Sequence, residues 1–216
     1  SKDGFVYVAD TWNHRIVKYD LEGDFVLSWG GFGDDADLYS MWGPREVLVG
    51  QDGMIYVADT GNKRISVFTD DGQIVRQVGM GGLGSGEFEE PVGLSLDSVG
   101  NLYVADTWNA RIQVFDNEGK FLYEWDVLEW DGQSLDNKPY LAIDDKENKL
   151  YATAPEGYRI LVWDLLGEPL MSWGDFGKEM NSFDLPTGID IDSSGGIYLA
   201  DSENNRVLYF MGFVDK

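Results

Sequence analysis

The stretch YVADTWNHRI at residues 7–16 decides the fold of this chain, because it returns as YVADTGNKRI at residues 56–65 and as YVADTWNARI at residues 103–112. Looser copies stand at residues 151–160 and 198–207. Their arginines are Arg15, Arg64, Arg111, Arg159 and Arg206, which lie 49, 47, 48 and 47 residues apart. A constant period of this length is typical of propellers and solenoids, in which each repeat forms one structural unit.

Each repeat is predicted to contain four short strands. The first follows a proline, and the four copies span residues 44–49, 91–96, 139–143 and 186–191. In the third repeat the other three are predicted at residues 102–106, 111–115 and 120–125. Their apolar residues alternate and no segment has a period near 3.6, which favours strands throughout. Four short antiparallel strands per repeat form a blade of a β-propeller, so the expected fold class is all-β.

The repeated motif resembles the signature of the NHL-repeat family, in which Tyr-Val-Ala-Asp-Thr-x-Asn-x-Arg-Ile is preceded by a Pro-x-Gly-Ile strand. Three close copies and two looser ones extend this resemblance over essentially the whole chain. The resemblance implies a propeller, most often of six blades, that serves as a binding platform. It names no ligand, because one fold carries many functions.

All repeats are expected to form one domain, with units at approximately residues 1–43, 44–90, 91–138, 139–185 and 186–216. The first unit starts at a second strand and the last stops after a third, so the predicted strand numbers are three, four, four, four and three. Either five blades close into a ring with two of them incomplete, or the chain is an arc of a larger ring. In an arc the open blade edges require a partner or self-association.

Composition excludes several classes of function. The chain has 16 Lys and Arg against 39 Asp and Glu, a net charge of −23, which opposes binding to nucleic acid and to anionic membranes. No run reaches the ~18 apolar residues of a membrane-spanning helix. Absence of cysteine excludes disulfides and thiol chemistry, and leaves the compartment open. The acidic surface is expected mainly to promote solubility.

Four aspartates precede an arginine by five residues: Asp10, Asp59, Asp106 and Asp201. Each pair is predicted to face across a hairpin as a structural ion pair, with further hydrogen bonds from the aspartate to the turn. In the fourth repeat Ala154 replaces the aspartate, so Arg159 is expected to lack this partner.

The sequence predicts no catalytic residue, metal site or cofactor. His14 is the only histidine, and the glycine-rich residues 79–86 lack the Lys-Ser/Thr that completes a phosphate-binding loop. A metal-dependent hydrolase or lactonase is the enzymatic alternative, but Glu46 alone near the predicted channel offers too few ligands.

Tryptophans provide the strongest indication of a binding surface. Trp12 and Trp108 fall in hairpin turns, whereas Trp42 and Trp130 fall in connections between blades, and both kinds of loop emerge on one face of a propeller. Arg45 and Tyr140, directly after strand-one prolines, are expected at the channel mouth on this face. These six residues are predicted to bind a protein or a glycan. The alternative is that the rings only cover the blade tops.

The predicted function is therefore a non-enzymatic binding module or scaffold. A structural role, as a propeller fragment that assembles into a larger ring, is the second possibility, because recently duplicated repeats carry few specialised residues.

Overall fold

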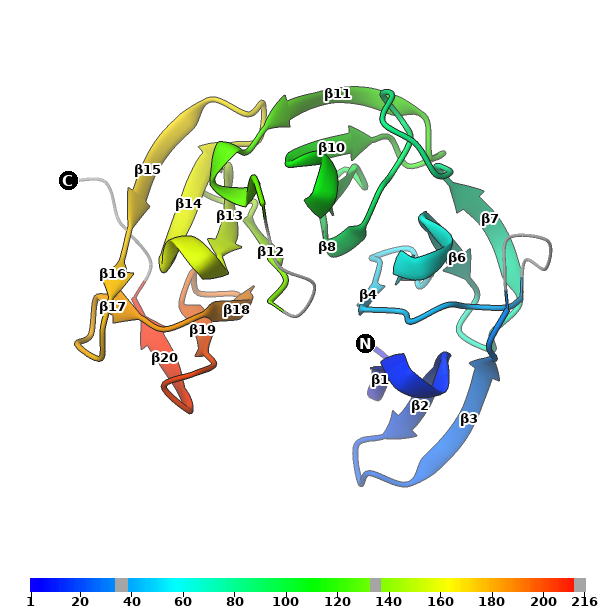
Figure 1. The fold of residues 1–216 in the computed structure, drawn as a ribbon. Coiled ribbons are helices and arrows are strands. Elements are labelled where there is room, and N and C mark those ends of the chain that lie inside the picture. Colours follow the sequence, from blue (N-terminus) through cyan, green and yellow to red (C-terminus); the bar gives the residue numbers. More distant parts are fainter. Residues whose placement is uncertain (34–38, 133–136, 212–216) are drawn as a thin grey trace.

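The computed structural model describes residues 1–33, 39–132 and 137–211, which form five small antiparallel sheets arranged along an arc (Figure 1). The strands of the first sheet are β1 (Phe5–Asp10), β2 (Arg15–Asp20) and β3 (Phe25–Gly30). Those of the second are β4 (Glu46–Val49), β5 (Ile55–Asp59), β6 (Arg64–Phe68) and β7 (Ile74–Val78). Those of the third are β8 (Pro91–Leu96), β9 (Leu102–Asp106), β10 (Arg111–Phe115) and β11 (Phe121–Asp126). Those of the fourth are β12 (Leu141–Asp144), β13 (Lys149–Ala154), β14 (Arg159–Asp164) and β15 (Pro169–Trp173). Those of the fifth are β18 (Pro186–Ile191), β19 (Ile197–Asp201) and β20 (Arg206–Phe210).

Each sheet is one blade of a propeller. Strand order within every sheet follows the chain, so each blade is an antiparallel meander, and β4, β8, β12 and β18 lie innermost around the axis (Figure 1). A short parallel pair, β16 (Asp175–Phe176) and β17 (Ser182–Phe183), joins the fourth blade to the fifth. The predicted all-β propeller, with three, four, four, four and three strands, is confirmed.

The hydrophobic core consists of four layers between neighbouring blades. Between the first and second blades, for example, Ile16 packs with Ile55, Val57 and Phe68. Strands β5, β9 and β13 are buried at every residue, because a middle blade has a neighbour on each side. This explains why these segments combine alternation with nearly continuous hydrophobicity in the sequence.

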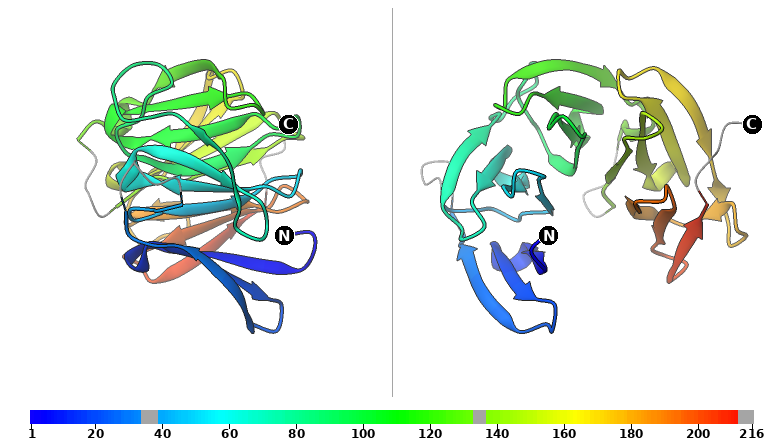
Figure 2. Two further views of the ribbon diagram at one scale, coloured as in Figure 1. Left: turned by 90° about the vertical axis from the view of Figure 1, so that its right-hand side faces the viewer. Right: turned by 180° about the vertical axis from the view of Figure 1, so that it is seen from behind.

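The arc does not close among the described residues. The first and fifth blades stand apart at its two ends, as the front and rear views both show (Figure 2). No helix in the described part of the chain is long and apolar enough to cross a membrane.

Candidate functional site on the loop face

One face of the arc carries both the turns between second and third strands and the connections between blades; we call it the loop face. Its turns include four short 3-10 helices, η1 (Thr11–Asn13), η2 (Thr60–Asn62), η3 (Thr107–Asn109) and η5 (Pro155–Gly157). Its connections span residues 31–45, 79–90, 127–140 and 174–185. The connection 127–140 holds a further 3-10 helix, η4 (Leu128–Trp130).

The repeated aspartate and arginine fix the connections of the loop face in place. Asp59 accepts hydrogen bonds from the Nε of Arg64 at 2.8 Å and from the side chain of Asn62 at 2.9 Å. It also accepts one from the backbone N–H of Trp42 at 2.8 Å, and Arg64 donates to the carbonyl of Ser40 at 2.8 Å. The motif therefore binds the backbone of the chain as it enters the blade.

The same arrangement recurs in the third and fifth blades. Asp106 accepts from the backbone N–H of Glu89 at 2.9 Å, and Asp201 accepts from that of Asp184 at 2.7 Å. Both aspartates are fully buried and pair with the arginine five residues later. The predicted structural ion pairs are confirmed, and their contact with the preceding connection is an addition that the motif alone did not reveal.

The first blade has the ion pair but in a more exposed setting. Asp10 and Arg15 lie 2.8 Å apart, and their side chains are 27% and 45% exposed. The hydrogen bond from Arg15, assisted by that from Asn13, lowers the pKa of Asp10 below its ordinary value. This pair is a natural reference for its buried equivalents.

In the fourth blade, which has Ala154 in place of the aspartate, a tryptophan packs into the blade junction. Trp130 is 1% exposed, lies in the core layer between the third and fourth blades with Ala154, and donates from Nε1 to the carbonyl of Thr153 at 3.0 Å. Arg159 does not lack a partner, since its Nη2 lies 3.8 Å from the carboxylate of Asp175. The inclusion of Trp130 in the predicted binding set is therefore corrected: its ring is inaccessible because it fills the blade junction.

Three predicted tryptophans do lie exposed on the loop face. Trp12 is 81% exposed, Trp42 50% and Trp108 47%. The guanidinium of Arg45 lies 5.8 Å from the ring centroid of Trp12, within the range of a cation–π contact. The ammonium of Lys138 lies 5.4 Å from the ring centroid of Trp108. Each contact joins the turn of one blade to the chain entering the next.

Arg45, Tyr140 and Glu46 come together at the mouth of the channel. The hydroxyl of Tyr140, at the entry to the fourth blade, lies 3.5 Å from the carbonyl of Arg45 at the entry to the second. The carboxylate of Glu46 accepts a hydrogen bond from the backbone N–H of Leu94, which links the innermost strands of the second and third blades. Arg45 and Tyr140, which the sequence predicts at the channel mouth, thus lie near each other.

Burial raises the pKa of Glu46 well above its ordinary value of 4.5, and the negative charge of Asp190 adds to this effect. The hydrogen bond from Leu94 acts in the opposite direction but is outweighed. Burial likewise raises the pKa of Tyr140.

We expect Glu46→Gln to make the chain more stable than the wild type at neutral pH. Because the folded chain holds a proton that the unfolded chain releases above pH 4.5, the wild type loses free energy of unfolding as the pH rises from 4.5 to the folded-state pKa. Glutamine keeps an acceptor for Leu94 and cannot ionise. Urea unfolding of both proteins between pH 4 and 8 measures the difference, which should grow with pH; a constant difference would contradict the assignment.

The loop face also exposes apolar residues that were not predicted from the sequence. They include Phe32, Met80, Leu83, Phe176 and Met180, with exposed fractions of 69%, 66%, 73%, 67% and 58%. Four of them adjoin glycines, in the segments GFG, GMG, GLG and DFG. A large apolar residue beside glycine in a connection was the available signal, since such a loop has no core of its own to fill.

His14 has a structural role in the loop face. Its Nδ1 accepts a hydrogen bond from the backbone N–H of Gly43 at 3.0 Å, and its ring lies 4.9 Å from that of Phe32. Among the described residues, no three His, Cys, Asp or Glu side chains are placed so that they could hold a metal ion.

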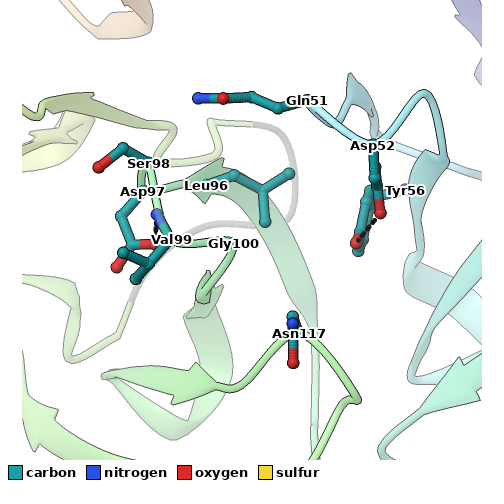
Figure 3. A pocket seen from close by; sticks show the side chains of 9 residues that line it. All are labelled: Gln51, Asp52, Tyr56, Leu96, Asp97, Ser98, Val99, Gly100 and Asn117. Atoms are coloured by element: carbon teal, nitrogen blue, oxygen red, sulfur yellow. Dashed lines mark hydrogen bonds between the residues drawn. The ribbon is translucent and has the colours of Figure 1, made fainter.

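The opposite face has a pocket of about 170 Å³ between the second and third blades (Figure 3). Its walls come from three turns and the adjoining ends of β5 and β8, and include Asp52, Tyr56, Asp97 and Asn117. The carboxylate of Asp97 accepts hydrogen bonds from Val99 and from the backbone and side chain of Asn101. Its carboxylate oxygens thus stabilise the turn, which is the usual role of an aspartate at such a position.

Comparisons with known proteins agree with the fold. A family model described as a 6-bladed beta-propeller matches residues 44–140, and the NHL repeat model matches residues 1–19 and 183–210. No curated protein matches the chain in sequence.

Solved structures of similar fold include both enzymes and a binding protein. A streptogramin B lyase is 17% identical with a TM-score of 0.66, and the match covers 99% of this chain and 67% of the lyase. Virginiamycin B lyase from Staphylococcus aureus is 14% identical with a TM-score of 0.65, covering 97% and 67%. A chain from a nidogen/laminin complex is 21% identical with a TM-score of 0.68, covering 97% and 72%. At these identities the similarity establishes the fold alone.

Proposed function

We propose that this chain, an NHL-repeat β-propeller, is a non-enzymatic module that binds a partner protein on its loop face. The observation that carries the proposal is the exposure of large apolar side chains there, such as Trp12 at 81% and Phe32 at 69%. These large side chains do not contribute to the core, which lies between the blades. Clustered apolar side chains of this kind mark interaction surfaces, where tryptophan contributes strongly to affinity.

The kinds of side chain favour a protein over a glycan. Aromatic rings alone would suit stacking on sugars, but Met80, Leu83 and Met180 are also exposed on this face. Aliphatic side chains offer no hydrogen bond to a sugar hydroxyl and a thioether sulfur accepts only weakly, whereas both pack well against a protein surface.

Arg45 adds a charged contact to this surface. Its guanidinium lies over Trp12, and no carboxylate of the described residues forms an ion pair with it. A carboxylate of the partner could accept paired hydrogen bonds from the guanidinium of Arg45 and lie beside the ring of Trp12. We therefore expect the partner to place an acidic group between Arg45 and the mouth of the channel, surrounded by apolar residues.

Related folds are compatible with either a catalytic or a binding role. One similar chain was solved in a nidogen/laminin complex, and others are lyases. A non-catalytic role is supported here by the engagement of His14, the only histidine, with Gly43 and Phe32.

The test is the double substitution Trp12→Ala with Trp108→Ala. It should weaken binding of the partner by more than about tenfold, because exposed tryptophans are typical energetic centres of interfaces. The partner would first be captured on the immobilised wild type and identified by mass spectrometry, and its affinity then measured by titration calorimetry.

The matched control is Leu21→Ala with Val99→Ala, two apolar residues that are 72% and 73% exposed in turns of the opposite face. Neither double variant should shift the melting temperature appreciably, since surface substitutions generally change stability little. Equal affinity for the tryptophan variant and the wild type would refute the proposal. A large fall in its melting temperature would assign these rings to packing.

A further inference from the structure

A groove of about 460 Å³ lies on the outer rim of the arc, between the third and fourth blades. It runs beside β15, the outermost strand of the fourth blade, and reaches the end of β11 and the helix η4 (Figure 1). Its lining includes the buried Trp163 of the core layer, together with Leu128 and Leu170, which are 80% and 50% exposed. Apolar side chains therefore continue from the core to the surface along this groove.

In the second and third blades, a charged side chain of the outermost strand joins that strand to another part of the molecule. Arg76 in β7 donates a hydrogen bond to the backbone carbonyl of Asn117, in the third blade, at 2.8 Å. Glu124 in β11 accepts one from the hydroxyl of Ser85, in the connection 79–90, at 3.1 Å. These contacts place polar side chains across the rim.

The fourth blade lacks such side chains. By the register of the strands, Met171 and Ser172 in β15 are the equivalents of Arg76 and Glu124. Methionine carries no charge, and the side chain of Ser172 forms no hydrogen bond to a described residue. At these two positions, therefore, no polar side chain crosses the groove.

The backbone of β15 has a free edge beside the groove. β15 is the last strand of its sheet, so its outer N–H and C=O groups have no partner strand among the described residues. Edge strands are commonly protected by charged residues, which β7 and β11 contain and the sequence PLMSW of β15 does not. β3, with the sequence FVLSWG, is also uncharged. We choose β15 because the groove adjoins it.

An added strand would direct apolar side chains toward the groove. Leu170 and Ser172 both line the groove, and Ser172 is paired with Leu161, which packs in the core layer toward the third blade. Side chains that face each other on neighbouring strands are close enough to touch. An apolar residue opposite Leu170 on an added strand would therefore cover it.

The charges of the groove are acidic. Asp126 and Glu129 line it and are exposed, and neither forms an ion pair with a described residue. No lysine or arginine is among the described residues that line it. Complementary charge favours a ligand that carries lysine or arginine.

We propose that this groove binds an extended segment of a partner protein, which adds a strand to the free edge of β15. The segment places an apolar side chain against Leu170 and basic side chains near Asp126 and Glu129. In such binding the backbone hydrogen bonds supply affinity, and the alternate side chains supply specificity. A second copy of this chain fits less well, since two chains that each carry a net charge of −23 repel each other.

The probe is a fluorescent peptide with the sequence Lys-Lys-Val-Thr-Leu-Thr-Val-Lys-Lys, which has the length of an ordinary strand. Two matched peptides accompany it. One carries methyl groups on the backbone nitrogens of Thr-Leu-Thr, which removes hydrogen-bond donors and keeps the charge. The other has glutamate in place of every lysine. Fluorescence anisotropy should show one unmodified peptide bound per chain, and at least about tenfold weaker binding of both matched peptides.

Leu170→Lys should weaken binding of the unmodified peptide by at least about tenfold, because it removes the apolar contact and repels the lysines of the peptide. Val75→Lys is the matched control. Val75 has the equivalent position in β7, is 47% exposed, and its substitution changes the net charge equally. Affinity should remain that of the wild type. Val26→Lys makes the same change in the uncharged β3 and should also leave affinity unaltered.

Hydrogen exchange locates the peptide independently of affinity. Bound peptide should slow exchange at the backbone amides of β15 and leave those of β3 and β7 unchanged, since an added strand protects only the edge with which it pairs. Protection of β3 instead of β15 would overturn the proposal.

Three further results would also overturn it. They are the absence of saturable binding, equally tight binding of the methylated peptide, and equal losses for Leu170→Lys and Val75→Lys, which would indicate adsorption to the acidic surface. A dimer of the chain that Leu170→Lys dissociates would make a second copy the occupant.

The double variant Trp12→Ala with Trp108→Ala separates this groove from the loop face. It should bind the peptide as tightly as the wild type does. Weaker binding would place the peptide on the loop face and would contradict the assignment to β15. The proposed function can thus fail without affecting the groove, and the reverse.

Discussion

Replacing Trp130 with alanine is expected to lower the free energy of unfolding by about 3–5 kcal/mol, the cost of truncating a large buried aromatic side chain. The indole is 1% exposed and lies in the layer between the third and fourth blades. Its loss would also leave the carbonyl of Thr153 without the hydrogen bond from Nε1. Urea unfolding monitored by circular dichroism measures the change.

Trp108→Ala provides the matched control on the same face of the molecule. Trp108 is 47% exposed and sits in a turn, so its removal creates no enclosed cavity, and a loss several times smaller is expected. Equal losses for the two variants would show that burial does not distinguish these tryptophans and would return Trp130 to the candidate binding surface.

Replacing Asp106 with alanine is expected to lower the free energy of unfolding by about 3–5 kcal/mol, because it removes the buried partner of the Arg111 cation, which keeps only its ion pair with the more exposed Glu124. Asp106 is fully buried and accepts hydrogen bonds from Glu89 N, Asn109, Arg111 and Gln113. The connection 79–90 would lose one of its attachments to the third blade, the hydrogen bond from Glu89 N. Hydrogen exchange should consequently accelerate at the amide of Glu89, because its N–H donates a hydrogen bond to Asp106 in the wild type.

Asp10→Ala is the corresponding control in the first blade. Asp10 forms the same pair with an arginine, but this pair is partly exposed, so water screens it and replaces the lost hydrogen bonds. A much smaller loss is expected. If Asp10→Ala and Asp106→Ala destabilised the chain equally, the contribution would come from the hairpin alone and not from the buried attachment to the connection.

The fold was predictable because the same strand pattern occurs in every repeat, so a strand that is ambiguous in one repeat can be assigned from its equivalents in the others. The Asp–Arg pairs were predictable for the same reason, since a turn of fixed length determines which residues face each other. The burial of Trp130 was not predictable. No other connection has a tryptophan at the equivalent position, and the burial depends on the small side chain of Ala154, which belongs to another repeat.

The channel mouth was only partly predictable. Arg45 and Tyr140 follow repeated prolines, so their common location follows from the period. The contact of Glu46 with Leu94 joins neighbouring blades at a position where the third and fifth repeats have Gly93 and Gly188. Sequence spacing fixes which strand Glu46 occupies, but the distance between strands of different blades is set by packing.

Attachment of the connections through backbone atoms leaves their side chains free to evolve. Asp59, Asp106 and Asp201 each hold the backbone N–H of the residue entering the blade, and Arg64, Arg111 and Arg206 donate to backbone carbonyls. Every residue other than proline offers the same two groups. Substitutions in the connections can therefore change which partner the loop face binds without removing the hydrogen bonds that attach the connections to the blades. Successive duplicates of one blade can in this way acquire different partners while keeping the same fold.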